Sequence, residues 1–333
     1  MSLRLIGITR RDVADSLERQ AAAGAGEPFT VVEAYGLCAI LAPAGARRFT
    51  LFRRRREARE AAEAACRLAH VAAIGAVLPA RPGTVIDDPM QALELLTGDS
   101  AALAQALDRF GAMRQVRIGV AWDEAAMIAG LRSRPDFAGL LADSVGTIRS
   151  QAARRIRAFL GEERMRLATI LAEALAAVVQ DRLALPPEGE DGVADLVVLI
   201  DGDRQTALAA ALAGFEARLV GGGRITCTAP AAVTSFAAVT IDRTDPARIE
   251  RARRLIRVDP IESPARLRAA WRAYVQRRLP ESIAETGDDL DFDGAGEAYR
   301  LLSRIAGQRR VLGHDPSLVA DIRRDGAGER RSA

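Results

Sequence analysis

The sequence predicts an α+β fold with a small ferredoxin-like layer in its second half and a helical region toward its C-terminal end. Three observations support this prediction. The 333 residues are enough for two domains of about 150 residues each and a further segment. Short runs rich in β-branched residues alternate with stretches whose apolar residues recur at helical spacing. Hydrophobic residues make up 49% of the chain, which supplies a core for more than one domain.

The N-terminal part alternates predicted strands and helices. Strands are assigned to runs of β-branched and apolar residues, and helices to stretches whose apolar residues recur every three or four positions. A turn is expected at Pro43 and Gly45, since both residues favour turn conformations. The predicted elements are a strand at Leu3–Ile8, a helix at Arg11–Ala23, a strand at Phe29–Leu41 and a helix at Phe52–Ala73.

Two prolines, Pro79 and Pro82, interrupt the apolar segment at residues 75–86. Proline has no N–H to donate to a strand ladder, so a central strand is excluded. We therefore predict an edge strand or a rigid buried loop that carries Arg81. A buried arginine needs a carboxylate or carbonyl partner, because an unpaired buried charge costs several kcal/mol. A structural ion pair is the favoured interpretation of Arg81, and a role in docking a partner is the alternative.

The middle of the chain predicts a helix at Asp87–Phe110, with Asp88 and Pro89 as its N-cap and first residue. Alternating apolar residues predict a strand at Gln115–Trp122. Strands joined by helices in this part of the chain are typical of a ferredoxin-like layer. The remaining elements are a helical stretch at Ser144–Leu183, a linker at Pro186–Gly192, a strand at Ala194–Ile200, a helix at Asp203–Leu219, a turn at Gly221–Gly223, strands at Arg224–Thr228 and Ser235–Ile241, and helices from Pro246 onward.

The composition excludes several kinds of chemistry. All 47 basic residues are arginine, so sites that need a lysine, such as a P-loop, a Schiff base or a kinase site, are absent. Two histidines and three widely spaced cysteines predict neither a zinc cluster nor a disulfide framework, and reduced thiols fit the cytoplasm. The net charge of +3 predicts no nucleic-acid partner. We also expect no signal peptide and no membrane span.

Three weaker patterns resemble functional sites. Gly221–Gly223 lies between a helix and a strand, where a turn is the better interpretation than a phosphate cradle. An acidic run that starts at Asp289 begins like a calcium loop, but Arg300 occupies the twelfth position, where glutamate is required. His70 lies on an alanine-rich helix near Leu68 and Val71, where a partly buried helix residue is the better interpretation than a catalytic base. We therefore predict no catalytic residue, no cofactor and no metal site, and a protein that is not an enzyme. An enzyme with an unrecognised site is the alternative.

Three blocks occur in a fixed order along the chain. Residues 77–86 read VLPARPGTVI, residues 116–122 read VRIGVAW, and residues 225–236 read ITCTAPAAVTSF. These blocks resemble the signature of the GvpF/GvpL family of gas vesicle proteins, whose patterns are V-L-P-x-R-F-G-T-V-F, V-E-x-x-V-K-x-W and T-G-P-W-P-P-Y-S-F. Pro82 replaces the usual phenylalanine, and Trp122 comes one residue early. The matching residues are Leu78, Pro79, Arg81, Gly83, Thr84, Trp122, Thr228, Pro230, Ser235 and Phe236.

The resemblance implies an N-terminal α+β domain at residues 1–112 and a modified ferredoxin-like domain at residues 113–244, with a long helical insertion. Residues 245–322 then form a helical extension, and residues 323–333 a disordered tail. It also implies a non-enzymatic accessory protein that binds the shell protein GvpA, and other accessory proteins of the gas vesicle. Such a protein supports the nucleation or assembly of gas vesicles, and it resides in the cytoplasm or at the vesicle.

The extension carries a second, fainter likeness. The helical stretches at residues 267–281 and 292–302 are similar to the two core helices of a J-domain. Leu279, Pro280 and Glu281 stand where such a domain has its His-Pro-Asp loop. This likeness implies an alternative function, in which the extension acts as a co-chaperone adaptor for a DnaK-type chaperone. A plain helical hairpin is the other interpretation, because leucine, alanine and tryptophan at helical spacing mostly form core contacts.

Overall fold

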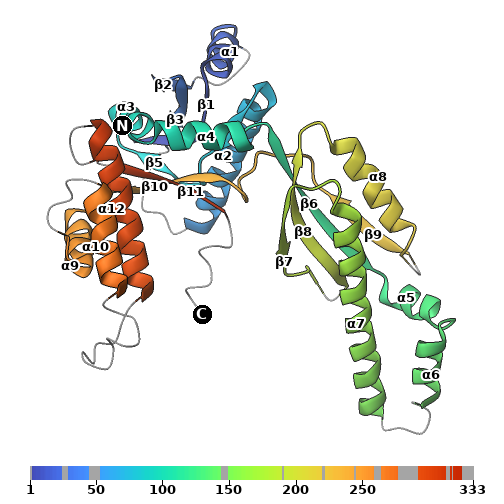
Figure 1. Ribbon diagram of the computed structural model, residues 1–333. Coiled ribbons are helices and arrows are strands. Elements are labelled where there is room, and N and C mark those ends of the chain that lie inside the picture. Colours follow the sequence, from blue (N-terminus) through green and yellow to red (C-terminus); the bar gives the residue numbers. More distant parts are fainter. Residues whose placement is uncertain are drawn as a thin grey trace. The chain divides into compact units, whose positions relative to one another are not determined.

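The computed structural model forms two compact units (Figure 1). Unit 1 comprises Met1–Gly111 and Ala237–Ala333, and unit 2 comprises Ala112–Phe236. The second unit is therefore inserted into the first, and the predicted separation of residues 245–322 from the N-terminal domain is wrong. The residues described are 2–24, 29–44, 53–143, 149–189, 191–219, 222–243, 245–258, 264–276, 292–312, 316 and 318–324.

Unit 1 contains a five-stranded sheet with the order β2-β3-β1-β4, in which β5 also pairs with β1. All of these pairings are antiparallel. Its strands are β1 (Leu3–Arg10), β2 (Thr30–Ala34), β3 (Leu37–Pro43), β4 (Val77–Pro79) and β5 (Val85–Ile86). Its N-terminal helices are α1 (Arg11–Ala22), α2 (Arg53–Ile74), α3 (Pro89–Gly98) and α4 (Ser100–Phe110). The predicted first strand and the first two predicted helices are confirmed.

Strand β1 lies between β3 and β4 in the sheet. It is therefore buried along nearly its whole length, from Leu3 to Thr9. Its one buried arginine, Arg4, is paired: the guanidinium lies 2.9 Å from the carboxylate of Glu60 on α2. Gly7 permits the close approach of β4, since a Cβ at this position would lie 2.8 Å from the carbonyl oxygen of Leu78. Sheet and helix are thus joined by a partly buried ion pair.

The predicted single strand at Phe29–Leu41 is instead a hairpin of β2 and β3. Tyr35 and Gly36 form its two-residue turn, with φ of 52° and 71°. Positive φ at both positions is typical of a type I′ turn, whose sequence signal is Asn-Gly or Asp-Gly. A tyrosine in this conformation is uncommon, and Gly36 alone is too weak a signal to predict the turn.

The predicted helix at Asp87–Phe110 is divided at Asp99 into α3 and α4. Its predicted start is confirmed, because the Asp88 carboxylate accepts a hydrogen bond from the N–H of Gln91 at 3.0 Å, and Pro89 occupies the first turn. The break places the Asp99 side chain between the two helices, at a half-buried position.

The C-terminal part of the chain completes unit 1. It contributes β10 (Ala238–Arg243), α9 (Pro246–Ile256), α10 (Pro264–Gln276), α12 (Phe292–Leu312) and β11 (Leu318–Arg323). Strands β10 and β11 pair antiparallel, and Ala80 forms a parallel bridge to Val239 of β10. The prediction of helices alone beyond Pro246 is therefore wrong for β11. Most of the tail predicted to be disordered, residues 325–333, lies outside the described residues.

Asp99 attaches this C-terminal part to α3 and α4. Its Oδ2 accepts a hydrogen bond from the N–H of Ala320 on β11 at 3.0 Å, and another from the side-chain amide of Gln308 on α12. Gln308 is 2% exposed, and its Cγ would lie 3.1 Å from a Cβ at Gly98. A larger residue at the end of α3 would therefore press on the side chain of Gln308, which would have to move by a few tenths of an ångström.

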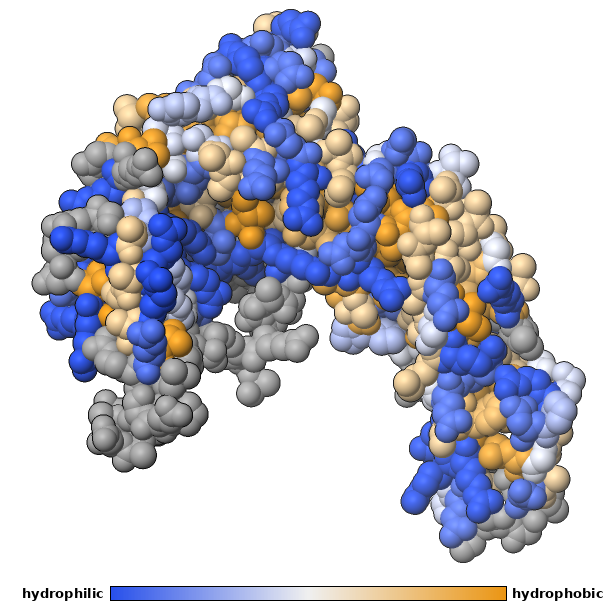
Figure 2. Space-filling view, in the orientation of Figure 1, coloured by the Kyte–Doolittle hydropathy of each residue, from blue (hydrophilic) through white to orange (hydrophobic). Residues whose placement is uncertain are grey.

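Helices α9, α10 and α12 enclose a small apolar core that also includes Val319 of β11. Trp271 stacks on Tyr274 and on Tyr299, with ring centroids 5.6 and 4.9 Å apart. Figure 2 shows hydrophilic side chains over these helices with a paler stripe between them. The two helices compared with a J-domain are thus present, whereas the loop at residues 279–281 lies outside the described residues.

Unit 2 contains a four-stranded antiparallel sheet with the order β7-β8-β6-β9. Its elements are β6 (Met113–Trp122), α5 (Glu124–Leu131), α6 (Pro135–Asp143), α7 (Arg149–Leu175), β7 (Asp181–Leu185), β8 (Gly192–Asp201), α8 (Gln205–Glu216) and β9 (Gly223–Cys227). The first strand lies between the third and the fourth, and a helical connection separates the first two strands. This arrangement is ferredoxin-like, so the predicted fold class is confirmed.

Two predicted elements of unit 2 differ from the structure. Strand β7 occupies the end of the stretch predicted to be helical at Ser144–Leu183. The strand predicted at Ser235–Ile241 starts later and pairs with β11 in unit 1 rather than joining the four-stranded sheet. In both places the local sequence does not show which strand the segment pairs with. Pairing with that partner strand determines its structure.

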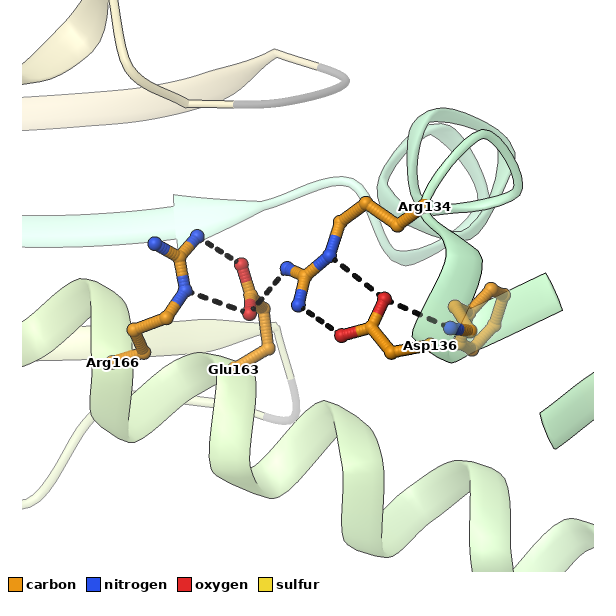
Figure 3. A network of polar contacts seen from close by, with 5 residues as sticks. Arg134, Asp136, Glu163 and Arg166 are labelled. Atoms are coloured by element: carbon orange, nitrogen blue, oxygen red, sulfur yellow. Dashed lines mark hydrogen bonds and ion pairs between the residues drawn. The ribbon is translucent and has the colours of Figure 1, made fainter. Parts of the chain in front are cut away.

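The helical connection between β6 and β7 is joined by ion pairs (Figure 3). Glu163 of α7 is 3% exposed and lies between Arg134 of the α5–α6 turn and Arg166 of α7. Its Oε2 is 2.9 Å from Arg134 Nη1 and 2.9 Å from Arg166 Nε. Arg134 also binds Asp136. Phe137 packs next to this network, with its ring centroid 5.0 Å from that of Phe159. The network therefore joins α6 to α7.

Candidate functional site

The first signature block folds as a turn that joins β4 to β5. Leu78 and Pro79 are both buried in β4, which lies at the end of the sheet order, as the edge-strand prediction requires. Gly83 has a φ of 85°, a conformation that glycine adopts at little cost. Thr84 closes the turn by donating from its N–H and its hydroxyl to the carbonyl oxygen of Arg81, at 3.1 and 2.7 Å. These four residues therefore shape the backbone.

Arg81 differs from its neighbours because its backbone is fixed while its side chain is exposed. Its N–H donates to the carbonyl oxygen of Val239 on β10 at 2.8 Å. The predicted buried ion pair of Arg81 is wrong: no hydrogen bond or ion pair joins its guanidinium to any side chain that the structure describes. The edge of β4 is continued by β10, so the chain itself covers the backbone groups that an edge strand would offer.

A cleft of about 660 Å³ lies over this turn. The turn and Asp87 form one part of its lining, and the strands β10 and β11 form another. Arg243 of β10 pairs with Asp87, with Nη1 and Oδ2 2.7 Å apart. The hydrogen bond that Arg243 donates to this carboxylate raises the pKa of Arg243. The first pair in the cleft thus stays ionised.

A second set of charges in the cleft is also matched. Arg323 of β11 lies 2.8 Å from Asp321 and 3.2 Å from Asp242. Chiefly the hydrogen bond to Asp321 raises the pKa of Arg323. Two of the three guanidinium groups that line the cleft therefore have carboxylate partners. Arg81 supplies the remaining positive charge, and an arginine in this situation favours a carboxylate, which it can bind through two parallel hydrogen bonds.

The third signature block follows β9 in unit 2 and is held by the start of β6. Thr228 exchanges two hydrogen bonds of 3.0 Å with the backbone of Arg117. The side chain of Gln115 accepts a hydrogen bond from the N–H of Ser235 at 2.8 Å and donates one to the hydroxyl of Thr234 at 3.0 Å. Phe236 is 5% exposed, so the segment ends in the interior. Pro230 is exposed.

Trp122, from the second block, ends β6 in the core of unit 2. It is 3% exposed, and the guanidinium carbon of Arg164 lies 4.8 Å from the centroid of its ring. A cation over an indole face is favourable. The block therefore has a packing role, with α7 as its partner, and Trp122 is not among the residues that line the cleft at Arg81.

Replacing Gln115 by leucine is expected to lower the free energy of unfolding of unit 2 by about 1–2 kcal/mol, because the Ser235 N–H loses its acceptor. Urea unfolding followed by Trp122 fluorescence measures the change in a Trp271→Phe background, since the chain contains two tryptophans. Gln151→Leu, at an exposed position of α7, is the matched control. Equal losses of stability for both substitutions would show that the Gln115 side chain does not stabilise the segment at Thr234 and Ser235.

His70 and the buried Cys38 form no second site with other described residues. His70 stacks on Phe29, with ring centroids 6.4 Å apart, and His314 lies outside the described residues. Burial raises the pKa of Cys38 to about 11, which leaves little thiolate at neutral pH. Within the described ranges, no group of three or more His, Cys, Asp and Glu side chains could hold a metal ion. None of the described helices has the length and apolar character of a membrane span.

Sequence reasoning singled out Arg81 but missed the residues that surround it. Arg243 and its partner Asp87 are 156 positions apart in the chain, and Arg323 lies on a strand that was not predicted. Gln115 was also missed, although its position at the start of a predicted strand is visible in the sequence. Neither spacing nor composition marks these residues, because their roles depend on contacts between distant segments.

Comparison with known proteins relates the chain to gas vesicle proteins. A sequence model of the family described as gas vesicle synthesis protein GvpL/GvpF matches residues 5–238. The fold is similar to the crystal structure of the gas vesicle protein GvpF from Anabaena sp. PCC7120, with a TM-score of 0.52, 15% identity, and coverage of 70% of this chain and 97% of that one. It is also similar to GvpF from Microcystis aeruginosa, with a TM-score of 0.51, 18% identity, and coverage of 70% and 98%. No curated protein matches the sequence.

Proposed function

The chain belongs to the gas vesicle synthesis protein GvpL/GvpF family, and from this membership we propose that it is an accessory protein that binds the shell protein GvpA. In this proposal it supports the nucleation or assembly of the vesicle wall. The observation that carries the proposal is the family match over residues 5–238. That range includes all of unit 2 and the five-stranded sheet of unit 1 except the start of β1.

The surface of unit 1 supports a function that works by contact. The signature turn presents Arg81 in an open cleft, while Leu78 and Pro79 are buried below it. A buried scaffold that fixes one exposed charged side chain suits the recognition of a protein partner. The proposed location is the gas vesicle and the cytoplasm around it, and other accessory proteins of the vesicle are further proposed partners.

Full-length tagged protein, produced together with GvpA, is expected to retain GvpA on an affinity resin at low and moderate salt. Western blotting of the eluate measures the retention, and a tagged protein of unrelated fold is the control. The full chain is required, because residues 237–333 complete unit 1. The proposal is rejected if GvpA is absent from the eluate at both salt concentrations.

The C-terminal part offers a second candidate function, that of an adaptor for a DnaK-type chaperone. The observation in its favour is the pair of helices α10 and α12 packed through Trp271 and Tyr299, which matches the two-helix pattern expected from the sequence. Retention of the chaperone without GvpA in the same experiment would support this function. Retention of GvpA alone would support the first.

A further inference from the structure

We propose that the cleft at the β4–β5 turn is a docking site for an acidic segment of the shell protein, in which Arg81 binds a side-chain carboxylate. This proposal rests on the proposed function and adds the chemistry by which the partner is recognised. It concerns only residues of unit 1.

The turn fixes the position of Arg81 before any partner binds. Its N–H is bound to Val239 at 2.8 Å, and its carbonyl oxygen accepts two hydrogen bonds from Thr84. Gly83 adds no side chain next to it. A fixed backbone reduces the conformational entropy that a loop loses on binding. Arg81 is therefore held ready for a partner.

The charges of the cleft favour an anion at Arg81. Arg243 and Arg323 are each bound to carboxylates of the protein itself, so neither is free to turn away from its strand. These pairs leave one guanidinium, that of Arg81, without a carboxylate among the described residues. Acidic residues Asp87 and Asp242 next to the paired arginines disfavour a second anion beside the first. The cleft thus selects a segment with a single, well-placed acid.

Strand β11 gives the cleft a wall that the family match does not include. The match ends at residue 238, whereas Arg323 and the partners that hold it belong to β11 and β10. An open cleft of about 660 Å³ accommodates an extended segment of a protein better than it encloses a small acid. The C-terminal part of the chain therefore contributes to specificity at this site.

Peptides that tile the GvpA sequence test the proposal, each made in its natural form and with its acids changed to amides. Fluorescence anisotropy with the full chain is expected to identify an acidic peptide whose affinity falls about tenfold for Arg81→Ala, since a charge-assisted pair is lost. The amide form should lose a similar factor, and Arg81→Lys should lose less. Rising salt should weaken the binding of the natural peptide.

Arg248→Ala is the matched control, because Arg248 is an exposed arginine of unit 1 on α9 and does not line this cleft. Acetate and a peptide with a free C-terminal carboxylate but no acidic side chain test the other sources of a carboxylate. Equal affinities for the wild type and Arg81→Ala, or equal binding of the amide forms, would overturn the proposal. If no acidic peptide binds while intact GvpA is still retained, the site is wrong but the proposed function stands.

Discussion

Replacing Glu163 by alanine is expected to lower the free energy of unfolding of unit 2 by about 2–3 kcal/mol. Breaking a fully buried ion pair typically costs 3–5 kcal/mol. The expected loss is smaller here, because Arg134 and Arg166 are 32% and 48% exposed and water can solvate them in part. Arg134 also keeps Asp136. The substitution removes the contact between Glu163 of α7 and Arg134, which directly precedes α6.

The pH dependence of this loss has a defined sign. The hydrogen bonds that Arg166 and Arg134 donate to Glu163 lower the pKa of this carboxyl below its ordinary value of 4.5. Its contribution to stability is therefore complete above about pH 4.5 and is lost as the pH falls through the lowered pKa. The difference between the wild type and Glu163→Ala should shrink on acidification to about pH 3.

Urea unfolding of the Trp271→Phe protein, followed by Trp122 fluorescence, measures both effects in unit 2. Glu162→Ala is the matched control, because Glu162 is the preceding residue of α7 and is exposed. A loss below about 0.5 kcal/mol at pH 7, the scale of an ordinary surface substitution, would show that the network adds little stability. A difference in stability between the wild type and Glu163→Ala that grows as the pH falls would contradict the expected pH dependence.

Replacing Asp99 by alanine is expected to lower the free energy of unfolding of unit 1 by about 2–4 kcal/mol. The amide of Gln308 and the N–H of Ala320 both lose their acceptor, and an unsatisfied buried donor costs about 1–3 kcal/mol. The C-terminal part of the chain should then separate more readily from α3 and α4. Hydrogen exchange at α12 and β11 reports that separation directly, because local opening exposes their amides.

Asp99→Asn should behave in the opposite way. Burial raises the pKa of Asp99, and it outweighs the hydrogen bonds from Ala320 and Gln308 and the attraction of Arg304. Asp321 adds a repulsion. The folded state thus favours the neutral acid, so the stability of unit 1 falls as the pH rises from the ordinary pKa of 3.8 through the raised one.

Asparagine keeps the acceptor oxygen and removes the buried charge. We therefore expect Asp99→Asn to unfold at a higher urea concentration than the wild type at pH 7 and to lack the pH dependence. Trp271 fluorescence in a Trp122→Phe background measures unit 1, and Asp108→Asn, an exposed position on α4, is the control. A protein destabilised by Asp99→Asn as strongly as by Asp99→Ala would show that the carboxylate itself is required.

Much of the fold could be predicted because the information is local. The Asp88-Pro89 pair gave the start of α3 correctly, and the alternation of Val116, Ile118 and Val120 gave β6. The wrong predictions concern elements whose structure depends on contacts between residues far apart in the chain. Strand β11 lies among polar, arginine-rich residues, and its assignment depends on β10, whose residues pair with it from about 80 positions away. The Tyr35–Gly36 turn has the usual glycine but carries a tyrosine where asparagine or aspartate is typical.

The candidate site could be predicted only as a single residue. The two prolines around Arg81 correctly indicated the edge strand β4, whereas the alternative of a rigid buried loop does not fit the exposed turn that carries Arg81. They could not reveal whether the arginine points into the interior or toward solvent, since both are compatible with the same apolar sequence. The attachment at Asp99 was beyond prediction for a similar reason, because Gln308 and Ala320 follow it by 209 and 221 positions.

The insertion of unit 2 into unit 1 determines the order in which the chain can fold during synthesis. Residues 2–111 leave the ribosome without β10, α12 and β11. The edge of β4 is uncovered until β10 follows, about 130 residues later, and the carboxylate of Asp99 lacks its partners on α12 and β11 until about two hundred further residues have been made. At about 5–20 residues per second this delay is about 10–40 seconds. Unit 2 is continuous and can finish folding within it. The nascent first half is therefore the stage at which the protein most needs protection from aggregation.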